Sequence, residues 1–221
     1  MNADLFAPFR ELASKLLPVL SGNDGAHDIS HLSRVWRNAR DIQRHEGGDL
    51  EILIAAALLH DCVEVPKQSP LRSKASQLAA SKATVFLTDL CWDAERVACV
   101  ASAIQSHSYA AGIAPTTLEA AVLQDADRLD AIGFTGIARC FYTAGRMGSA
   151  LYDPSNPCGA GRVPNDAAYA LDHFPAKLLN LAEGFQTATG RRIAARRQAA
   201  VRSFYFGMVK ELESDKENDG E

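Results

Sequence analysis

Long apolar runs, paired cysteines and an excess of positive charge are all missing from this 221-residue chain. The longest apolar run covers residues 52–59, well short of the roughly 18–20 residues that a membrane-spanning helix needs. The five cysteines are odd in number, lie far apart and form no CxxC pair, which favours a reducing compartment over a disulfide framework. The first 20 residues carry early acids and no basic stretch before an apolar one, so we expect no secretory signal. We therefore expect a soluble, cytoplasmic protein with no membrane partner.

The charge balance limits the partners that the chain attracts. Its 23 Lys and Arg residues are outnumbered by 27 Asp and Glu residues, which gives a formal net charge of −4 at pH 7. Without a general positive field we expect no nucleic-acid partner, although local basic clusters could still hold phosphate. The chain also lacks GxxxxGK[ST], GxSxG and HExxH motifs, which disfavours P-loop, serine-hydrolase and zinc-protease chemistry.

The composition is typical of a helical globular protein. Hydrophobic residues make up 47% of the chain and charged residues 23%, and this length can bury one sizeable core. No strand-like alternation runs for long, so we expect an all-α fold. Residues 145–166 hold four glycines and three prolines and predict a long irregular loop. Helices are predicted over residues 5–20, 27–45, 49–64, 74–90, 93–107, 117–132, 136–144, 167–185 and 191–212.

Three segments place metal-ligand residues at the edge of an apolar helix. His60 and Asp61 follow the apolar run 52–59, and His31 and Asp127 lie in HDISHLSRV and LQDADRLDAIG. A polar pair beside such a run costs several kcal/mol of desolvation unless it finds a partner, and a divalent cation would satisfy both groups. A buried His–Asp hydrogen bond, or emergence of the pair into solvent at the helix end, is the alternative.

The order of these residues carries a family resemblance. His31, then His60-Asp61, then Asp127 within Ala-Asp-Arg-Leu resembles the HD-domain metal-dependent phosphohydrolase superfamily over residues 27–132. The stretches GIARCFYTAGRMGSALYDP and LDHFPAKLLNL extend the similarity to the bacterial YedJ-like subgroup. The resemblance implies an HD helical bundle with a helical C-terminal extension. We thus expect a single domain over residues 1–221, with an HD core at about 27–132, an extension at about 133–213 and a polar tail at 214–221.

The resemblance also implies a metal centre. In this family His31, His60, Asp61 and Asp127 would bind one divalent ion and leave two open positions for water and a phosphate oxygen. Imidazole and carboxylate ligands suit several ions, so Mn, Mg, Fe, Co, Ni or Zn are all expected candidates. Such an ion polarises phosphoryl oxygen and acidifies water, and Asp61 would then also take part in catalysis.

Other groups near the first and last ligands have more than one interpretation. His27 and His31 share a helical face, and the match to LSRV selects His31 as the ligand. His27 or Asp28 then either orients a ligand or begins the helix. Asp130 lies near Asp127 on the helix and is expected to orient a ligand. Asp125 points away and is expected to be structural or exposed.

Glu64 is a candidate general base. It follows His60 by four residues and Asp61 by three, so a helix continuing to residue 64 would put all three on one side. A solvated Glu at a helix end is the alternative. Guanosine tetraphosphate hydrolases of the same superfamily carry Glu-Asp at this position and His-Asn after Asp-Arg-Leu. This chain has Glu64-Val65 and Asp130-Ala131, which disfavours that activity.

Phosphate binding requires cations or histidines near the metal. Lys67, Arg128 and His107 are the candidates in the first half, with His107 expected near substrate at a single-metal site. In the second half Arg146 begins the glycine-rich loop, and His173 and Lys177 would share a helical face. The resemblance implies that this region closes over substrate. A capping helix and solvated surface charges are the alternatives.

The sequence thus predicts a metal-dependent phosphohydrolase acting on a nucleotide-like phosphate. Hydrolysis of (d)NTP to monophosphate and pyrophosphate is the first expectation, because related bacterial HD proteins of this size catalyse it. Phosphomonoester or cyclic phosphodiester hydrolysis comes next. A catalytically silent module that binds a nucleotide or metal is the alternative from another class.

Overall fold

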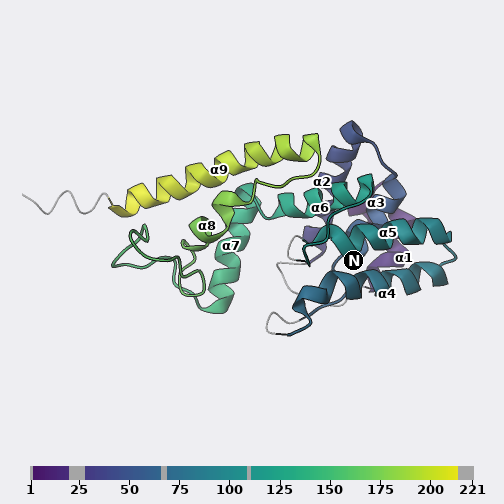
Figure 1. Ribbon diagram of the computed structural model, residues 1–221, viewed down its shortest axis with the longest axis horizontal. Helices are drawn as coiled ribbons and strands as arrows, with labels where there is room; N and C mark the ends of the chain where they lie inside the picture. The colour runs from purple at the N-terminus through teal and green to yellow at the C-terminus, as the bar shows by residue number, and fades with distance from the viewer. Residues whose placement is uncertain (1, 20–27, 66–68, 109–110, 214–221) are drawn as a thin grey trace, which may run out of the picture. The chain divides into compact units, whose positions relative to one another are not determined.

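The computed structural model describes residues 2–19, 28–65, 69–108 and 111–213, and helices dominate them (Figure 1). No β-strand occurs in these ranges, where an isolated bridge pairs Ala150 with Tyr169. The predicted all-α class is therefore confirmed. None of the helices described is long and apolar enough to cross a membrane.

The chain forms two compact units, and the first of them is discontinuous in sequence. The first unit comprises Met1–Leu129 and Phe185–Gly190, and the second comprises Asp130–Gly184 and Arg191–Glu221. The expectation of one domain over residues 1–221 stays a prediction. The first unit contains α1 (Arg10–Leu16), α2 (Ile29–Glu46), α3 (Leu50–Leu59), α4 (Ala75–Asp89), α5 (Ala94–His107) and nearly all of α6 (Leu118–Asp130).

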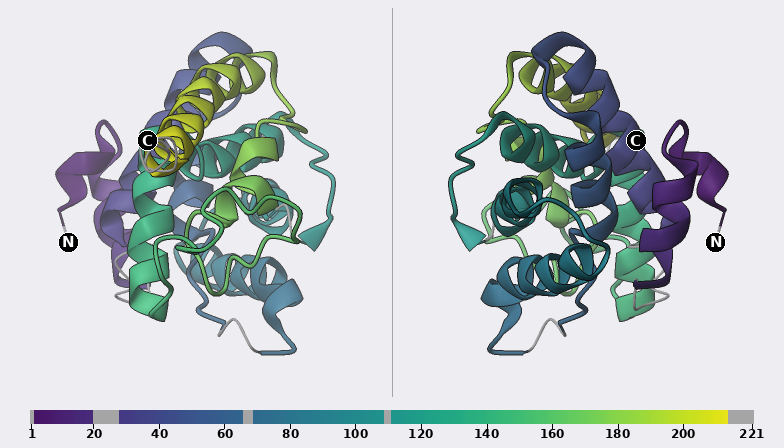
Figure 2. Two further views of the ribbon diagram at one scale, coloured as in Figure 1. Left: turned by 90° about the vertical axis from the view of Figure 1, so that its left-hand side faces the viewer. Right: turned by 90° about the vertical axis from the view of Figure 1, so that its right-hand side faces the viewer.

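Helix α3 forms the centre of the first unit. It contacts α1, α2, α4 and α5, which surround it in the views of Figures 1 and 2. Every residue from Ile52 to Leu59 is buried, as the continuous apolar run predicts. Burying one Leu or Ile side chain contributes about 1.5–3 kcal/mol, so α3 anchors the core that leads directly into His60.

Side chains fix the start of the helices beside α3. Asp49 caps α3, because its Oδ1 accepts hydrogen bonds from the backbone N–H groups of Glu51 (2.8 Å) and Ile52 (3.1 Å). Asp93 caps α5 in the same way, which confirms the N-cap predicted there. The guanidinium of Arg96 in α5 binds Asp49 at 2.8 Å and Glu51 at 2.8 Å. Arg96 therefore ties the start of α3 to α5.

The Asp49 cap makes the stability of the first unit sensitive to acid. The hydrogen bond from Arg96 lowers the pKa of Asp49, and the backbone N–H groups act in the same direction against the effect of burial. The folded pKa thus lies below the value of about 3.9 for an unfolded chain. The stabilisation is complete above about pH 4 and is lost as the pH falls through the folded pKa. An Arg96→Met variant should have a lower urea midpoint than wild type at pH 7, and the difference should shrink below about pH 4. A difference of the same size at pH 7 and pH 3 would contradict this assignment.

Several predicted boundaries need correction. The first predicted helix is interrupted around Pro8: 3-10 turns at Ala3–Phe6 and Leu17–Val19 flank a short α1. Proline cannot donate a backbone hydrogen bond, so the helix starts only after it. Helix α3 ends at Leu59 rather than residue 64, and residues 60–65 form a turn and an irregular segment.

The second unit contains α7 (Gly133–Met147), α8 (His173–Ala176) and most of α9 (Ala188–Glu213). The helix predicted over residues 167–185 is wrong: only α8 and a 3-10 turn at Leu178–Asn180 form there. Pro175 removes a backbone donor within this stretch, and Gly184 adopts a positive φ of 75°.

The irregular segment between α7 and α8 has internal order. The guanidinium of Arg162 pairs with the carboxylate of Asp172, lies 3.8 Å from Asp153 and stacks over the ring of Tyr169 at 5.4 Å. The backbone N–H of Asn165 also donates to Asp172 at 2.6 Å. Arg162 thus joins separate parts of the irregular loop that the glycines and prolines of residues 145–166 predicted.

The end of α4 carries a residue in the left-handed region. Cys91 has a φ of 60°, and the N–H groups of Cys91 and Trp92 return to carbonyls of the last helical turn, as in a Schellman motif. Glycine is preferred at this position because it has no Cβ. We expect Cys91→Gly to stabilise the protein by about 0.5–1 kcal/mol, measured as a rise of about 2 °C in Tm. Cys91→Ala keeps a Cβ and serves as the control; an equal rise for both would show that the thiol rather than the φ angle matters.

Candidate metal centre

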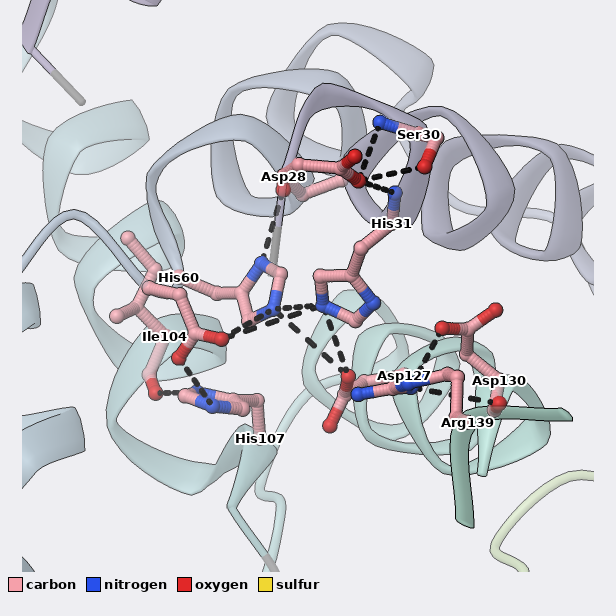
Figure 3. Close-up of polar contacts among 11 residues, drawn as sticks. Asp28, Ser30, His31, His60, Ile104, His107, Asp127, Asp130 and Arg139 are labelled. Carbon is pink, nitrogen blue, oxygen red and sulfur yellow. Dashed lines mark hydrogen bonds and ion pairs between the residues drawn. The ribbon is translucent and has the colours of Figure 1, made fainter. Parts of the chain in front are cut away.

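Two buried imidazoles and two carboxylates converge at the ends of α2 and α3 and along α6 (Figure 3). The Nε2 atoms of His31 and His60 lie 3.3 Å apart. Asp127 Oδ1 lies 3.6 Å from His31 Nε2 and 3.7 Å from His60 Nε2. Asp61 Oδ2 lies 3.5 Å from His60 Nε2 and 3.9 Å from His31 Nε2. The structure therefore brings together the four residues that the resemblance implied as ligands.

Two overlapping sets of these ligand atoms are close enough to share an ion: His31, His60 and Asp127 form one set, and His60, Asp61 and His107 form the other, with all atoms of each set within 4.8 Å of one another. Ligand atoms at about 2.1 Å from one metal lie about 3.0–3.4 Å apart when the bonds meet at right or tetrahedral angles. The His–His and His–carboxylate separations of 3.3–3.9 Å run from this range to slightly above it, so the two imidazoles and either carboxylate lie near bound geometry. Both imidazoles are 1% exposed, whereas the side chains of Asp61 and Asp127 are 41% and 29% exposed. The centre is thus reached from the carboxylate side.

The hydrogen bond of His60 presents a lone pair to the centre. Its Nδ1 lies 2.9 Å from the carbonyl oxygen of Ala57, which can only accept a hydrogen bond. Nδ1 therefore carries the proton, and in the neutral ring Nε2 is left as an acceptor. This is the tautomer of a metal-ligating histidine. The donor chemistry of the cluster fits a divalent transition ion bound by imidazole and carboxylate.

His107 at the end of α5 joins the same cluster. Its ring lies 4.8 Å from the ring of His60, centroid to centroid, and its Nε2 is 3.8 Å from Asp61 Oδ1. Its Nδ1 lies 2.6 Å from the carbonyl oxygen of Ile104, which leaves Nε2 as an acceptor in the neutral ring. Burial and the neighbouring His60 lower the pKa of His107, so the ring is neutral at pH 7. Asp61 thus faces His60 with one oxygen and His107 with the other.

Asp28 begins α2, in line with one of its two predicted roles. Its Oδ1 accepts hydrogen bonds from the backbone N–H groups of Ser30 (3.0 Å) and His31 (3.2 Å). Burial acts to raise the pKa of Asp28, but these bonds and the Ser30 hydroxyl lower it overall. The cap holds the backbone N–H of His31, and the role of Asp28 in orienting a ligand stays a prediction. His27 lies outside the described residues.

The three acids of α6 have separate surroundings. Asp127 faces His31 and His60, whereas Asp125 is fully buried and accepts hydrogen bonds from the N–H groups of Gln186 and Thr187, each at 2.8 Å. Burial raises the pKa of Asp125 against these bonds. Asp130, 1% exposed, binds Arg139 at 2.6 Å in the second unit. Its expected role in orienting a ligand stays a prediction.

The structure places the predicted catalytic base, Glu64, and the predicted phosphate ligand Arg128 in different surroundings. The argument that Glu64 shares a helical side with His60 is wrong, because α3 has already ended; Glu64 is exposed in the following segment. Arg128 is 8% exposed and its guanidinium stacks over Phe185 at 5.3 Å. Lys67 lies outside the described residues. The functional roles of these three residues stay predictions.

The candidates from the second half lie in the second unit. Arg146 lies in the last turn of α7, so the prediction that it begins the loop is wrong, and its guanidinium stacks over the ring of Tyr142 at 5.8 Å. His173 Nδ1 lies 2.9 Å from Asp166 Oδ2. The expectation that His173 and Lys177 share a helical face is wrong, because α8 ends at Ala176. Substrate contacts by these residues stay predictions.

Sequence reasoning missed three polar side chains beside the centre. Asn38, Gln124 and Lys82 each donate to a backbone carbonyl next to a cluster residue. A weak signal existed: Asn38 follows His31 by seven residues and Gln124 precedes Asp127 by three, so each shares a helical side with a predicted ligand.

Comparison with known proteins assigns the family. The model of the HD domain matches residues 28–132. The uncharacterized protein YpgQ of Bacillus subtilis (strain 168) is 34% identical over 198 residues, which cover 89% of this chain and 88% of YpgQ. The chain belongs to the HD-domain superfamily. Membership of the YedJ-like subgroup stays a prediction.

Solved structures of HD proteins resemble nearly the whole chain. An HD-superfamily hydrolase from Bacillus thuringiensis is 29% identical with a TM-score of 0.69, covering 91% of this chain and 97% of its own. The structure of B. subtilis YpgQ in complex with ADP is 32% identical with a TM-score of 0.67, covering 91% and 96%. The similarity therefore extends well beyond the matched HD segment, and the hydrolase fold applies to this chain as a whole.

Proposed function

We propose that this protein is a metal-dependent phosphohydrolase that converts (d)NTP to monophosphate and pyrophosphate. The observation that carries the proposal is the cluster of His31, His60, Asp61 and Asp127, in which the two imidazole nitrogens lie 3.3 Å apart and each carboxylate lies within 3.9 Å of both. Phosphoryl transfer needs little covalent chemistry from the protein and much positioning and charge stabilisation, which such a centre supplies. One divalent ion is proposed, with Mn, Mg, Fe, Co, Ni and Zn as candidates.

The proposed chemistry assigns separate tasks to the side chains. The four ligands would hold the ion, which when bound supplies Lewis acidity that polarises a phosphoryl oxygen and lowers the pKa of water. Asp61 and Asp127, the exposed members of the cluster, face the side from which substrate would enter. His107 presents an acceptor atom next to Asp61 and is proposed to contact substrate or the attacking water.

The remaining predicted contacts belong to the proposal as well. Lys67 and Arg128 are proposed to offset charge on the phosphates, and Glu64 to act as general base. The proposal gains support for a nucleotide ligand from the YpgQ complex, since that relative binds ADP. Five free cysteines agree with the proposed cytoplasmic location.

The test is a nucleotide panel in the presence of Mn²⁺, with phosphate and pyrophosphate release assayed separately. We expect pyrophosphate from nucleoside triphosphates, loss of activity with EDTA and recovery on adding Mn²⁺. Asp61→Ala is the blank, because it removes one ligand of the ion. Phosphate from monophosphates, or hydrolysis of a cyclic diester, would instead select a related phosphohydrolase activity.

Two further outcomes discriminate between classes. Metal binding without any turnover would favour a nucleotide- or metal-binding regulator. Absence of both would refute the proposal. Unchanged turnover in Glu64→Gln would remove Glu64 as the general base while leaving the rest intact.

A further inference from the structure

Three backbone carbonyls beside the metal centre share an unusual feature: each accepts a hydrogen bond from the side chain of a different helix. The carbonyls belong to Ser106, Ala126 and Cys62, and each is next in sequence to a cluster residue. The donors are Gln124, Asn38 and Lys82.

Gln124 joins α6 to the end of α5. Its Nε2 lies 2.7 Å from the carbonyl oxygen of Ser106, and its side chain is 4% exposed. Ser106 immediately precedes His107, and its carbonyl is in the last turn of α5, where helical partners run out. One buried amide therefore fixes the backbone from which His107 projects.

Asn38 joins α2 to α6. Its Nδ2 lies 2.9 Å from the carbonyl oxygen of Ala126, and the residue is 6% exposed. Ala126 precedes Asp127, and Asn38 lies two turns after His31 on α2. This bond thus sets the register between the helix that carries His31 and the helix that carries Asp127.

Lys82 joins α4 to the turn after α3. Its Nζ lies 2.9 Å from the carbonyl oxygen of Cys62 and 3.0 Å from that of Val19. Cys62 directly follows Asp61 in the turn after α3, where the backbone N–H of Cys62 also donates to the carbonyl oxygen of Leu59 at 3.1 Å. Bonds from a charged donor are stronger than neutral ones, so one ammonium holds the turn that carries Asp61.

We propose that these three donors are positioning residues that tune the affinity of the metal centre. The inference rests on the proposed function, because it assumes that the cluster binds an ion. Metal affinity depends on ligand atoms held close to their bound geometry, and outer groups that orient ligands change it by about 10–100-fold. Each donor lies on a helix different from the segment whose carbonyl it binds, and that segment carries a cluster residue. Together they link α2, α4, α5, α6 and the turn after α3 around one point.

The test measures Mn²⁺ affinity by isothermal titration calorimetry on the full chain. Gln124→Met, Asn38→Leu and Lys82→Met keep size while removing the donor. We expect the dissociation constant for Mn²⁺ to rise roughly 10-fold in each. Lys82→Arg keeps a charged donor and should restore affinity to within about threefold of wild type.

The matched control is Gln198→Met. Gln198 is 6% exposed and its Nε2 donates to the carbonyls of Leu178 (3.0 Å) and Leu179 (2.9 Å), neither of which adjoins a cluster residue. It removes the same kind of buried amide, so it should lower Tm as Gln124→Met does while leaving Mn²⁺ affinity unchanged. Lys82 is only half-buried, so Lys82→Met and Lys82→Arg should fold. Their Mn²⁺ affinities can then be compared with wild type even if Gln124→Met does not fold.

The outcomes separate the inference from the function. Unchanged Mn²⁺ affinity in the donor-free variants, or an equal loss in Gln198→Met, would overturn the inference while wild-type binding still supports the metal centre. A wild-type chain that binds no Mn²⁺ would overturn the proposed function and this inference with it.

Discussion

Asp127→Asn should weaken the proposed Mn²⁺ binding and triphosphate hydrolysis by more than about 100-fold, since groups that only orient a ligand already cost 10–100-fold. The carboxylate oxygen lies 3.6 Å and 3.7 Å from the two buried imidazole nitrogens of His31 and His60. An amide of the same shape carries no charge and is a poor ligand for a hard or borderline ion. Calorimetry with Mn²⁺ and pyrophosphate release would measure both losses.

Asp125→Asn is the matched comparison on the same helix. Asp125 accepts three hydrogen bonds from Gln186 and Thr187, including the Thr187 hydroxyl at 2.7 Å, and faces no member of the cluster. The NH₂ group of an asparagine would face one of these donors where Asp125 has an acceptor oxygen, so a hydrogen bond is lost. We therefore expect a loss of about 2 kcal/mol in unfolding free energy with Mn²⁺ affinity retained. If instead Asp125→Asn abolished metal binding and Asp127→Asn left it intact, the assignment of the two acids would be reversed.

Gly190→Ala should destabilise the protein by about 3 kcal/mol, at the upper end of what overpacking costs. A Cβ at this position would lie 2.2 Å from Asp125 Oδ2 and 2.8 Å from Thr187 Oγ1. Both atoms are buried and fixed by hydrogen bonds to each other and to the backbone, so neither can move without breaking those bonds. Urea unfolding of the wild type and the variant, each fitted to a two-state transition, would give the difference in unfolding free energy.

Gly207→Ala tests whether this effect is local. Gly207 lies in the same helix, and nothing comes within 4 Å of an added Cβ. Alanine is the better helix former, so this variant should gain about 0.5–1 kcal/mol. A loss at Gly190 together with a gain at Gly207 would attribute the loss to the Asp125 contact; a loss at both would attribute it to the helix backbone.

The local features of the fold could be predicted from the sequence because they depend on neighbouring residues. The apolar run before His60 predicts a buried helix, and Asp93 predicts a cap, since both depend on spacing within one turn or two. The choice of Asp127 over Asp125 required the family pattern. Periodicity places the two acids on different faces of α6 but cannot say which face meets the histidines.

What could not be predicted depends on contacts that are distant in sequence. The bond from Asn38 to Ala126 spans 88 residues, and that from Asp125 to Thr187 spans 62. No local pattern encodes such pairs. The early end of α3 and the near absence of helix over residues 167–185 also depend on tertiary packing and on Pro175, which outweigh the helical propensity of the surrounding residues.

The return of residues Phe185–Gly190 to the first unit has a consequence for synthesis in the cell. The fully buried Asp125 accepts hydrogen bonds from Gln186 and Thr187, which are translated after the entire intervening segment 130–184. At about 5–20 residues per second, the ribosome needs several seconds to supply them. During that interval Asp125 lacks the N–H and hydroxyl donors that bind it in the folded protein. Folding of the first unit can therefore be completed only late in translation. A gene truncated after residue 132 would encode an HD segment that lacks Gln186 and Thr187 and so never forms their hydrogen bonds to Asp125.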